Sequence, residues 1–143
     1  MTSSVATLRP QVVARAGNCC EYCLISQTDR LFSFHIEHIV AEKHRGETKL
    51  ENLCLSCPQC NNFKGSDLTS IDPETDLITP LFNPRKQKWS EHFRLNGPMI
   101  EPLTPEGRVT VWTLRLNESQ RVIERESLIE VGTYPCAAFL SNE

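Results

Sequence analysis

The sequence predicts an α+β fold with a small N-terminal core held by two cysteine pairs, followed by a C-terminal extension of short strands and helices. The pairs are Cys20-x-x-Cys23 and Cys57-x-x-Cys60. Between them, apolar and polar residues alternate over positions 32–37, which is typical of a half-buried strand. Helix start and stop signals lie on both sides of this segment, so helices and strands are expected within one short stretch of chain.

Capping signals place two helices in the core. A first helix is expected after a cap at Ser4 or Thr7, and Gly17 marks its end. A second helix is expected over 57–64, with a proline in its first turn and Gly65 as its stop. The predicted core is therefore a strand, a polar loop and a helix, with a cysteine pair at each end.

The second half of the chain contains turn and cap signals at shorter intervals. They predict a strand over 77–82, a helix over 86–93, a hairpin at Asn96-Gly97 with a return strand over 99–103, helices capped by Thr104 and Asn117, and a loose tail over 132–143. A chain of 143 residues has room for one full core. We therefore predict a core over 1–70 and an extension over 71–143 that packs on it.

Composition excludes several classes of protein. The chain is 39% hydrophobic and 23% charged with a net charge of −3, which argues against disorder and against a polybasic protein that coats DNA by charge alone. It has neither the apolar run of a secretory signal nor one that could cross a membrane. These features predict a soluble cytoplasmic protein, in which clustered cysteines favour metal binding over disulfides.

The two Cys-x-x-Cys pairs predict a structural zinc site. Tetrahedral coordination by four thiolates is the simplest interpretation, because a two-residue spacer lets both sulfurs of a pair reach one ion. Unrelated buried thiols, an iron-sulfur cluster and a redox pair are the alternatives. Cys19 and Cys54 leave the choice of ligands open, but two matched spacers favour the set Cys20, Cys23, Cys57 and Cys60. We expect Cys54 to pack as a small apolar residue and Cys136 to be a bystander.

A series of polar residues between and after the cysteine pairs carries a family resemblance. Glu37-His38 is followed by Asn52 and by Asn61 directly after the last cysteine, with Lys64 three residues further. This combination resembles the HNH endonuclease family, in its branch with Cys-x-x-Cys pairs. The resemblance implies a ββα-metal fold that grips one divalent ion and hydrolyses DNA phosphodiester bonds. The family more often has Asp at position 37 and frequently His at position 61.

Physical chemistry assigns a role to each of these residues. His38 is the expected base that activates water, because a neutral imidazole accepts a proton near neutral pH. Glu37 and Asn61 offer hard oxygen atoms to a catalytic Mg²⁺ or Mn²⁺. The side-chain carbonyl of Asn52 is expected to hold the His38 ring. Each residue also has an ordinary alternative as a solvated or capping side chain.

Basic residues predict where DNA would bind. Lys64, Arg45, Arg85 and Lys88 are the expected phosphate contacts, with a solvated charged face as the alternative. Two other functions fit parts of the sequence: a non-catalytic zinc module that binds nucleic acid, and a zinc-stabilised domain that binds protein. The oligomeric state cannot be predicted from these motifs.

Overall fold

The computed structural model describes residues 4–28 and 30–141. Within these residues the chain combines helices with three two-stranded antiparallel sheets, which confirms the predicted α+β class. The helices are α1 (Val5–Ala16), α2 (Pro58–Lys64), α3 (Trp89–His92), α4 (Pro105–Thr113), α5 (Ser119–Glu130) and α6 (Ala137–Ser141). The strand pairs are β1 (His35–His38) with β2 (Leu53–Ser56), β3 (Thr69–Ile71) with β4 (Ile78–Pro80), and β5 (Phe93–Asn96) with β6 (Met99–Pro102).

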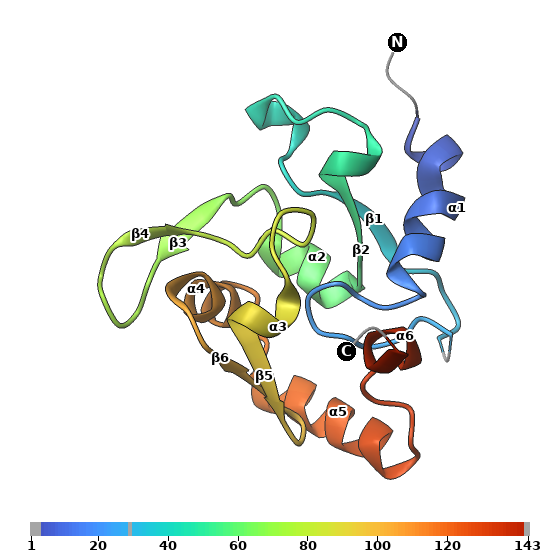
Figure 1. Ribbon diagram of the computed structural model, residues 1–143, viewed down its shortest axis with the longest axis vertical. Coiled ribbons are helices and arrows are strands. Elements are labelled where there is room, and N and C mark those ends of the chain that lie inside the picture. Colours follow the sequence, from blue (N-terminus) through green and yellow to red (C-terminus); the bar gives the residue numbers. More distant parts are fainter. Residues whose placement is uncertain (1–3, 29, 142–143) are drawn as a thin grey trace.

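The first hairpin and the helix that follows it form a ββα unit. His35 pairs with Ser56 and His38 with Leu53, so the polar loop between the strands begins directly after His38. Two short 3-10 helices, Glu42–His44 and Leu50–Asn52, lie within this connection. Helix α1 packs against both strands, and α2 packs against β1 (Figure 1). Strand β1 therefore contacts α1, α2 and β2, so its end is fixed by three elements.

The caps predicted for α1 and α2 are confirmed. The Ser4 hydroxyl accepts the Thr7 N–H at the start of α1, and Gly17 ends the helix at a φ of 59°. At α2, the Cys57 sulfur accepts the Cys60 N–H, and Gly65 ends the helix at a φ of 51°. Both glycines adopt positive φ angles that side chains with a Cβ rarely take. Local chemistry thus sets the bounds of both helices.

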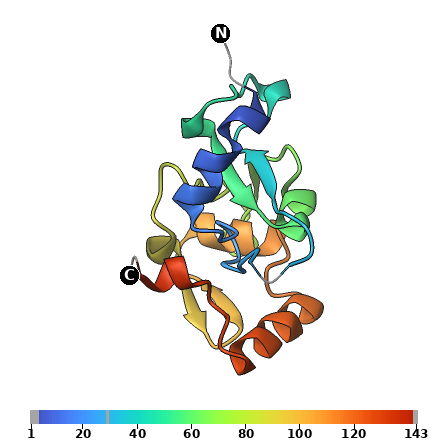
Figure 2. The ribbon, with the colours of Figure 1, turned by 90° about the vertical axis from the view of Figure 1, so that its right-hand side faces the viewer.

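Helix α4 lies at the centre of the C-terminal half. The Thr104 hydroxyl caps it by accepting the Gly107 N–H, as the sequence predicts. It packs against β6 and against the β3–β4 hairpin, which extends to one side of the molecule (Figure 1). A Cβ on Gly107 would lie 2.3 Å from the His92 carbonyl oxygen, so only glycine permits this close approach. The view in Figure 2 shows α4 crossing the molecule above the β5–β6 hairpin and α5.

Several predicted element bounds are wrong. The first strand begins at His35, and Phe32 lies before it with 61% of its surface exposed. The helix predicted over 86–93 is limited to α3, and the strand over 77–82 to β4. Asn117 does not cap α5, because its side chain bonds both the N–H and the carbonyl of Ile100. Glu118 occupies the cap position without a side-chain cap bond.

The C-terminal tail is not loose over its described length. Residues 137–141 form α6, and Cys136 makes a disulfide with Cys19, 117 residues earlier in the chain. Cys136 also donates its N–H to the Leu24 carbonyl at 2.9 Å. Cys136 is therefore not the bystander expected from the sequence. In Figure 1, α6 lies beside the loop that follows α1.

No helix within residues 4–28 and 30–141 has both the length and the apolar character needed to cross a bilayer.

Candidate active site and metal centre

Four cysteines converge where the ββα unit meets the turn over residues 20–23 (the first knuckle). The sulfur atoms of Cys20, Cys23, Cys57 and Cys60 all lie within 4.8 Å of one another, and all four residues are buried. The Cys23 N–H lies 3.5 Å from the Cys20 sulfur, and the Cys60 N–H lies 3.4 Å from the Cys57 sulfur. Such a donor set suits a four-coordinate structural metal. The predicted set is confirmed as a group that can bind a metal.

A buried arginine from the C-terminal half contacts this cysteine cluster. Arg121 on α5 donates from Nη2 to the Cys60 sulfur at 3.0 Å, and from Nη1 to the Leu114 carbonyl at 2.6 Å. Burial lowers the pKa of Arg121, but the charge of the neighbouring thiolates outweighs burial and raises the pKa above its ordinary value. Helix α5 therefore supplies a permanent positive charge to the sulfur atoms.

His38 lies at the last position of β1 and is half-buried. Its Nε2 atom lies 2.9 Å from the Thr48 hydroxyl oxygen, across the loop that follows β1. Among the described residues, its Nδ1 atom has no hydrogen-bond partner within the protein. The ring is thus held on one side only.

Glu37 precedes His38 on β1, and its side chain points to the opposite, buried face. Its Oε2 atom accepts the Tyr22 hydroxyl at 2.6 Å and the Cys54 thiol at 3.3 Å. The Lys64 ammonium lies 3.8 Å from Oε2 and donates to the Ile39 carbonyl at 2.9 Å. Burial raises the pKa of Glu37, while the ammonium partly offsets that rise. Oε1 is buried with no hydrogen-bond partner in the described part of the chain.

Asn61 lies in the first half of α2 and is half-buried. It precedes Lys64 by three residues, so the two side chains share one face of the helix. Because the Lys64 ammonium is close to Glu37, this face of α2 is directed toward the carboxylate. Among the described residues, no hydrogen bond joins the Asn61 side chain to Glu37, so the structure does not bring these two predicted ligands into direct contact.

Asn52 has a different set of partners from the one predicted. Its Oδ1 atom accepts the Val40 N–H at 2.9 Å, and its Nδ2 atom donates to the carbonyls of Val40 and Glu47, each at 2.9 Å. These bonds close the loop that follows β1. The predicted direct contact between Asn52 and the His38 ring is therefore wrong, because backbone groups use the amide instead.

The four predicted phosphate contacts have very different exposure. Arg45 and Lys88 are exposed. Lys64 is 2% exposed and is used inside the protein. Arg85 pairs with Glu21, and both side chains are mostly buried. Only Arg45 and Lys88 thus lie on the surface with their charges available to a polyanion.

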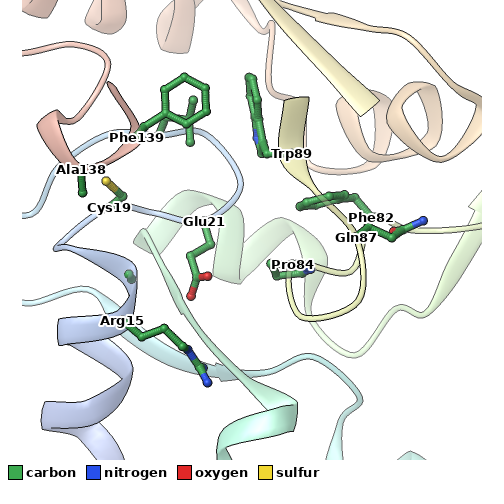
Figure 3. Close-up of a pocket in the computed structure, with 11 residues that line it drawn as sticks. Arg15, Cys19, Glu21, Phe82, Pro84, Gln87, Trp89, Ala138 and Phe139 are labelled. Atoms are coloured by element: carbon green, nitrogen blue, oxygen red, sulfur yellow. The ribbon is translucent and has the colours of Figure 1, made fainter. Parts of the chain in front are cut away.

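A pocket shown in Figure 3 lies between α1, the first knuckle, the 82–89 segment and α6. Its upper wall contains Trp89 and Phe139, whose rings pack edge to face with centroids 5.2 Å apart. Arg15 and Glu21 line the opposite side, and the Glu21 carboxylate accepts the Leu55 N–H at 2.8 Å. None of the residues predicted to act in chemistry lines this pocket.

Sequence reasoning missed three residues of these sites. Thr48 lies in a polar loop with no motif around it, and Arg121 lies 61 residues after the cysteine that it contacts. Tyr22 offered a signal, because it lies inside the first Cys-x-x-Cys pair, directly before Cys23. Only the folded chain shows that its hydroxyl binds Glu37.

These features define a small α+β protein with a buried cluster of four cysteines that could hold a metal and, on the adjoining hairpin, a half-buried histidine that follows a buried carboxylate in sequence. Residues 20–67 match the family model described as HNH endonuclease, which confirms over this segment the resemblance named from the sequence. The match indicates a nuclease or other nucleic-acid-related function. No solved structure matches the chain.

A longer protein is similar to most of the chain. The Septu protein PtuB of Bacillus thuringiensis is 24% identical over 120 residues, a match that covers 82% of this chain and 44% of that protein. The chain therefore spans less than half the length of this relative.

Proposed function

We propose that this protein is a metal-dependent DNA endonuclease that hydrolyses phosphodiester bonds with a water molecule activated by His38. The observation that most supports this function is the pair formed by a half-buried imidazole and, one residue earlier, a carboxylate with a buried oxygen atom that has no partner among the described residues. Titratable groups with a shifted pKa are enriched at functional sites, and burial raises the pKa of Glu37. The HNH match over the same segment points to the same chemistry.

The residues present fit a hard divalent cation. In the described part of the chain, Oε1 of Glu37 is an acceptor without a donor, and Asn61 provides an amide oxygen on α2. Oxygen ligands of this kind favour Mg²⁺ or Mn²⁺. Glu37 and Asn61 would hold that ion. When bound, the ion would supply positive charge that offsets the negative charge developing around phosphorus and on the leaving oxygen.

The protein side chains would carry out the proton transfer and the positioning. His38 takes a proton from water as the water oxygen attacks phosphorus and the bond from phosphorus to the leaving oxygen breaks. Lys64 keeps a positive charge 3.8 Å from Glu37 and so favours the ionised carboxylate. Arg45 and Lys88 are exposed and are proposed to bind DNA phosphates.

The four cysteines are proposed to bind a structural Zn²⁺. All four ligand positions would be occupied by sulfur, so this ion has no open position for a substrate. We also propose that residues 1–70 are the nuclease core and that residues 71–143 pack on it. The Arg121 contact to Cys60 and the Cys19–Cys136 disulfide support this packing, because each joins a residue of the first segment to one of the second.

A plasmid-nicking experiment tests this function. Zinc-loaded protein is incubated with supercoiled plasmid in Mg²⁺, in Mn²⁺ and without added metal, beside His38→Ala and the control His44→Ala. His44 is an exposed histidine of the same loop. We expect nicking that requires added metal and falls about 10²–10⁴-fold in His38→Ala only, because a general base contributes a factor of that size.

Zinc content is measured in every sample, so that loss of the fold is not read as loss of catalysis. Equal nicking by His38→Ala and the control would remove His38 as the base. DNA binding without cleavage under any metal would instead favour the non-catalytic zinc module.

A further inference from the structure

We propose that Thr48 is a positioning residue that holds the His38 ring in one orientation and one tautomer, with Nδ1 as the basic atom. This inference rests on the proposed function, because it assigns a role within the same site. The observation that carries it is the 2.9 Å contact between the Thr48 hydroxyl and the His38 Nε2 atom. No other side chain of the described residues bonds this ring.

The chemistry of imidazole gives this contact its consequence. A neutral histidine has one N–H and one basic nitrogen. The Thr48 hydroxyl can accept from Nε2–H or donate to Nε2, and we assign it the acceptor role because Nδ1, with no protein partner among the described residues, is then the free base. When Nε2–H donates to the Thr48 hydroxyl, the lone pair lies on Nδ1. The contact also persists after Nδ1 takes a proton, because Nε2 stays a donor. The ring can therefore act as a base without turning.

The loop geometry explains why a threonine at this position can hold the ring. Asn52 donates to the Glu47 carbonyl, directly before Thr48, and bonds both backbone groups of Val40, two residues after His38. One side chain therefore ties together the two backbone segments that carry the ring and the hydroxyl. Side chains held in this way lose little freedom when the contact forms.

The absence of a side chain at Gly46 lets the same loop pass close to Val40 and Asn52. A Cβ at this position would lie 1.6 Å from the Val40 carbonyl oxygen and 2.9 Å from the Asn52 Nδ2 atom. The Gly46 N–H also donates to the Ala41 carbonyl at 3.0 Å. Any larger residue would push the loop away from β1 and move the Thr48 hydroxyl with it. Asn52 thus acts on His38 indirectly, through the backbone and Thr48.

The test uses two substitutions in the full chain, with a matched control. Thr48→Val removes the hydroxyl and keeps the shape, and Thr48→Ser keeps the hydroxyl. Thr69→Val is the control, because Thr69 is exposed on β3. We expect Thr48→Val to lower kcat of plasmid nicking about 10–100-fold with little change in KM, since misplacing a reacting group costs about that much. Thr48→Ser restores kcat, and Thr69→Val leaves it unchanged.

A second readout does not depend on cleavage. Proton–nitrogen correlation spectra of the histidine rings, recorded where the imidazoles are neutral, report the tautomer directly, and His38→Ala identifies the His38 signals. We expect a single Nε2–H form in the native chain, in Thr48→Ser and in Thr69→Val. Thr48→Val should instead show a mixture of the two tautomers.

Two outcomes would overturn the inference. One is native kcat in Thr48→Val, and the other is a His38 spectrum that the substitution leaves unchanged. Failure of the proposed function would look different, because the native protein would then not nick DNA. The ring spectra would still show whether Thr48 sets the tautomer of His38.

Discussion

The cysteine cluster and the His38–Glu37 pair lie in the same ββα unit but differ in how completely their polar atoms are paired. In the cluster, all four sulfur atoms face one another in the interior, and Arg121 adds a positive charge. In the pair, Nδ1 of His38 and Oε1 of Glu37 have no hydrogen-bond partner among the described residues. One group is complete once a single metal binds, and the other retains free acceptors.

This difference assigns the two groups different roles: the cluster stabilises the fold, and the pair carries the proposed chemistry. Buried polar atoms are paired in most proteins, so an unpaired one marks a place where a ligand or a reaction supplies the missing partner. A cluster with every position filled stabilises the fold and leaves nothing for a substrate. Substitutions in the cluster should therefore change stability, and substitutions in the pair should change activity.

The largest effect is expected when the cluster loses one ligand. Cys57→Ser should abolish stoichiometric zinc binding and cooperative unfolding, because structural zinc contributes about 10–16 kcal/mol and a whole domain is stable by about 5–15 kcal/mol. Metal analysis and thermal melting measure both. Cys54→Ala is the control, because Cys54 is buried outside the cluster. Equal zinc content in the two variants would contradict this assignment.

A smaller loss of stability is expected when the lysine beside Glu37 is replaced. Lys64→Met removes the ammonium 3.8 Å from Glu37 and the donor to the Ile39 carbonyl. The free energy of unfolding should fall by about 3 kcal/mol, because the substitution leaves a buried carboxylate without its cation. Urea denaturation measures this change against Lys86→Met, which alters an exposed lysine. A loss equal to that of the control would show that the buried lysine does not stabilise Glu37.

The disulfide should contribute a similar or slightly smaller amount to the free energy of unfolding. Cys136→Ser opens the bridge to Cys19, and we expect unfolding to become easier by about 2–4 kcal/mol in guanidinium without reductant. Zinc content should stay at the native value, since neither residue belongs to the cluster. With reductant present, the native chain and the variant should unfold together. A difference that persists under reduction would assign the effect to packing.

The smallest effect is expected from the arginine beside the cluster. Arg121→Met should speed zinc transfer to a chromogenic chelator about 10–100-fold, because residues that bond metal ligands typically change affinity by that factor. Arg125→Met is a matched control on the same helix. Arg125 is equally buried but donates to the carbonyls of Pro98 and Leu116. Equal release rates in both variants would remove the role of Arg121 at the sulfur atoms.

Local signals explain which elements could be predicted from the sequence. Helix α2 has a capping residue, a proline in its first turn and Gly65 at its end, and all of these act within one turn of the helix. The cluster was predictable for the same reason, because its spacing is local within each pair. Asn117 shows the limit of this approach, since tertiary contacts with Ile100 use the side chain that would have capped α5.

Long-range contacts explain what could not be predicted. Lys64 ends an amphipathic helix, where a lysine usually faces water. In the folded chain a carboxylate and a backbone carbonyl enclose it. The partner of Cys136 lies 117 residues away, and spacing gives no information over that distance. The contact between His38 and Thr48 crosses a loop whose shape depends on Asn52 and Gly46 together.

The Cys19–Cys136 bridge makes most of the chain a covalent ring. The bridge spans 117 residues, a span that contains all four cluster cysteines and the whole ββα unit. A protease that cuts one peptide bond inside this ring leaves two ends still joined through sulfur. The nicked molecule keeps its mass on a non-reducing gel and separates into fragments only after reduction. A single backbone cut within the ring therefore releases no piece of the protein that carries a cluster cysteine.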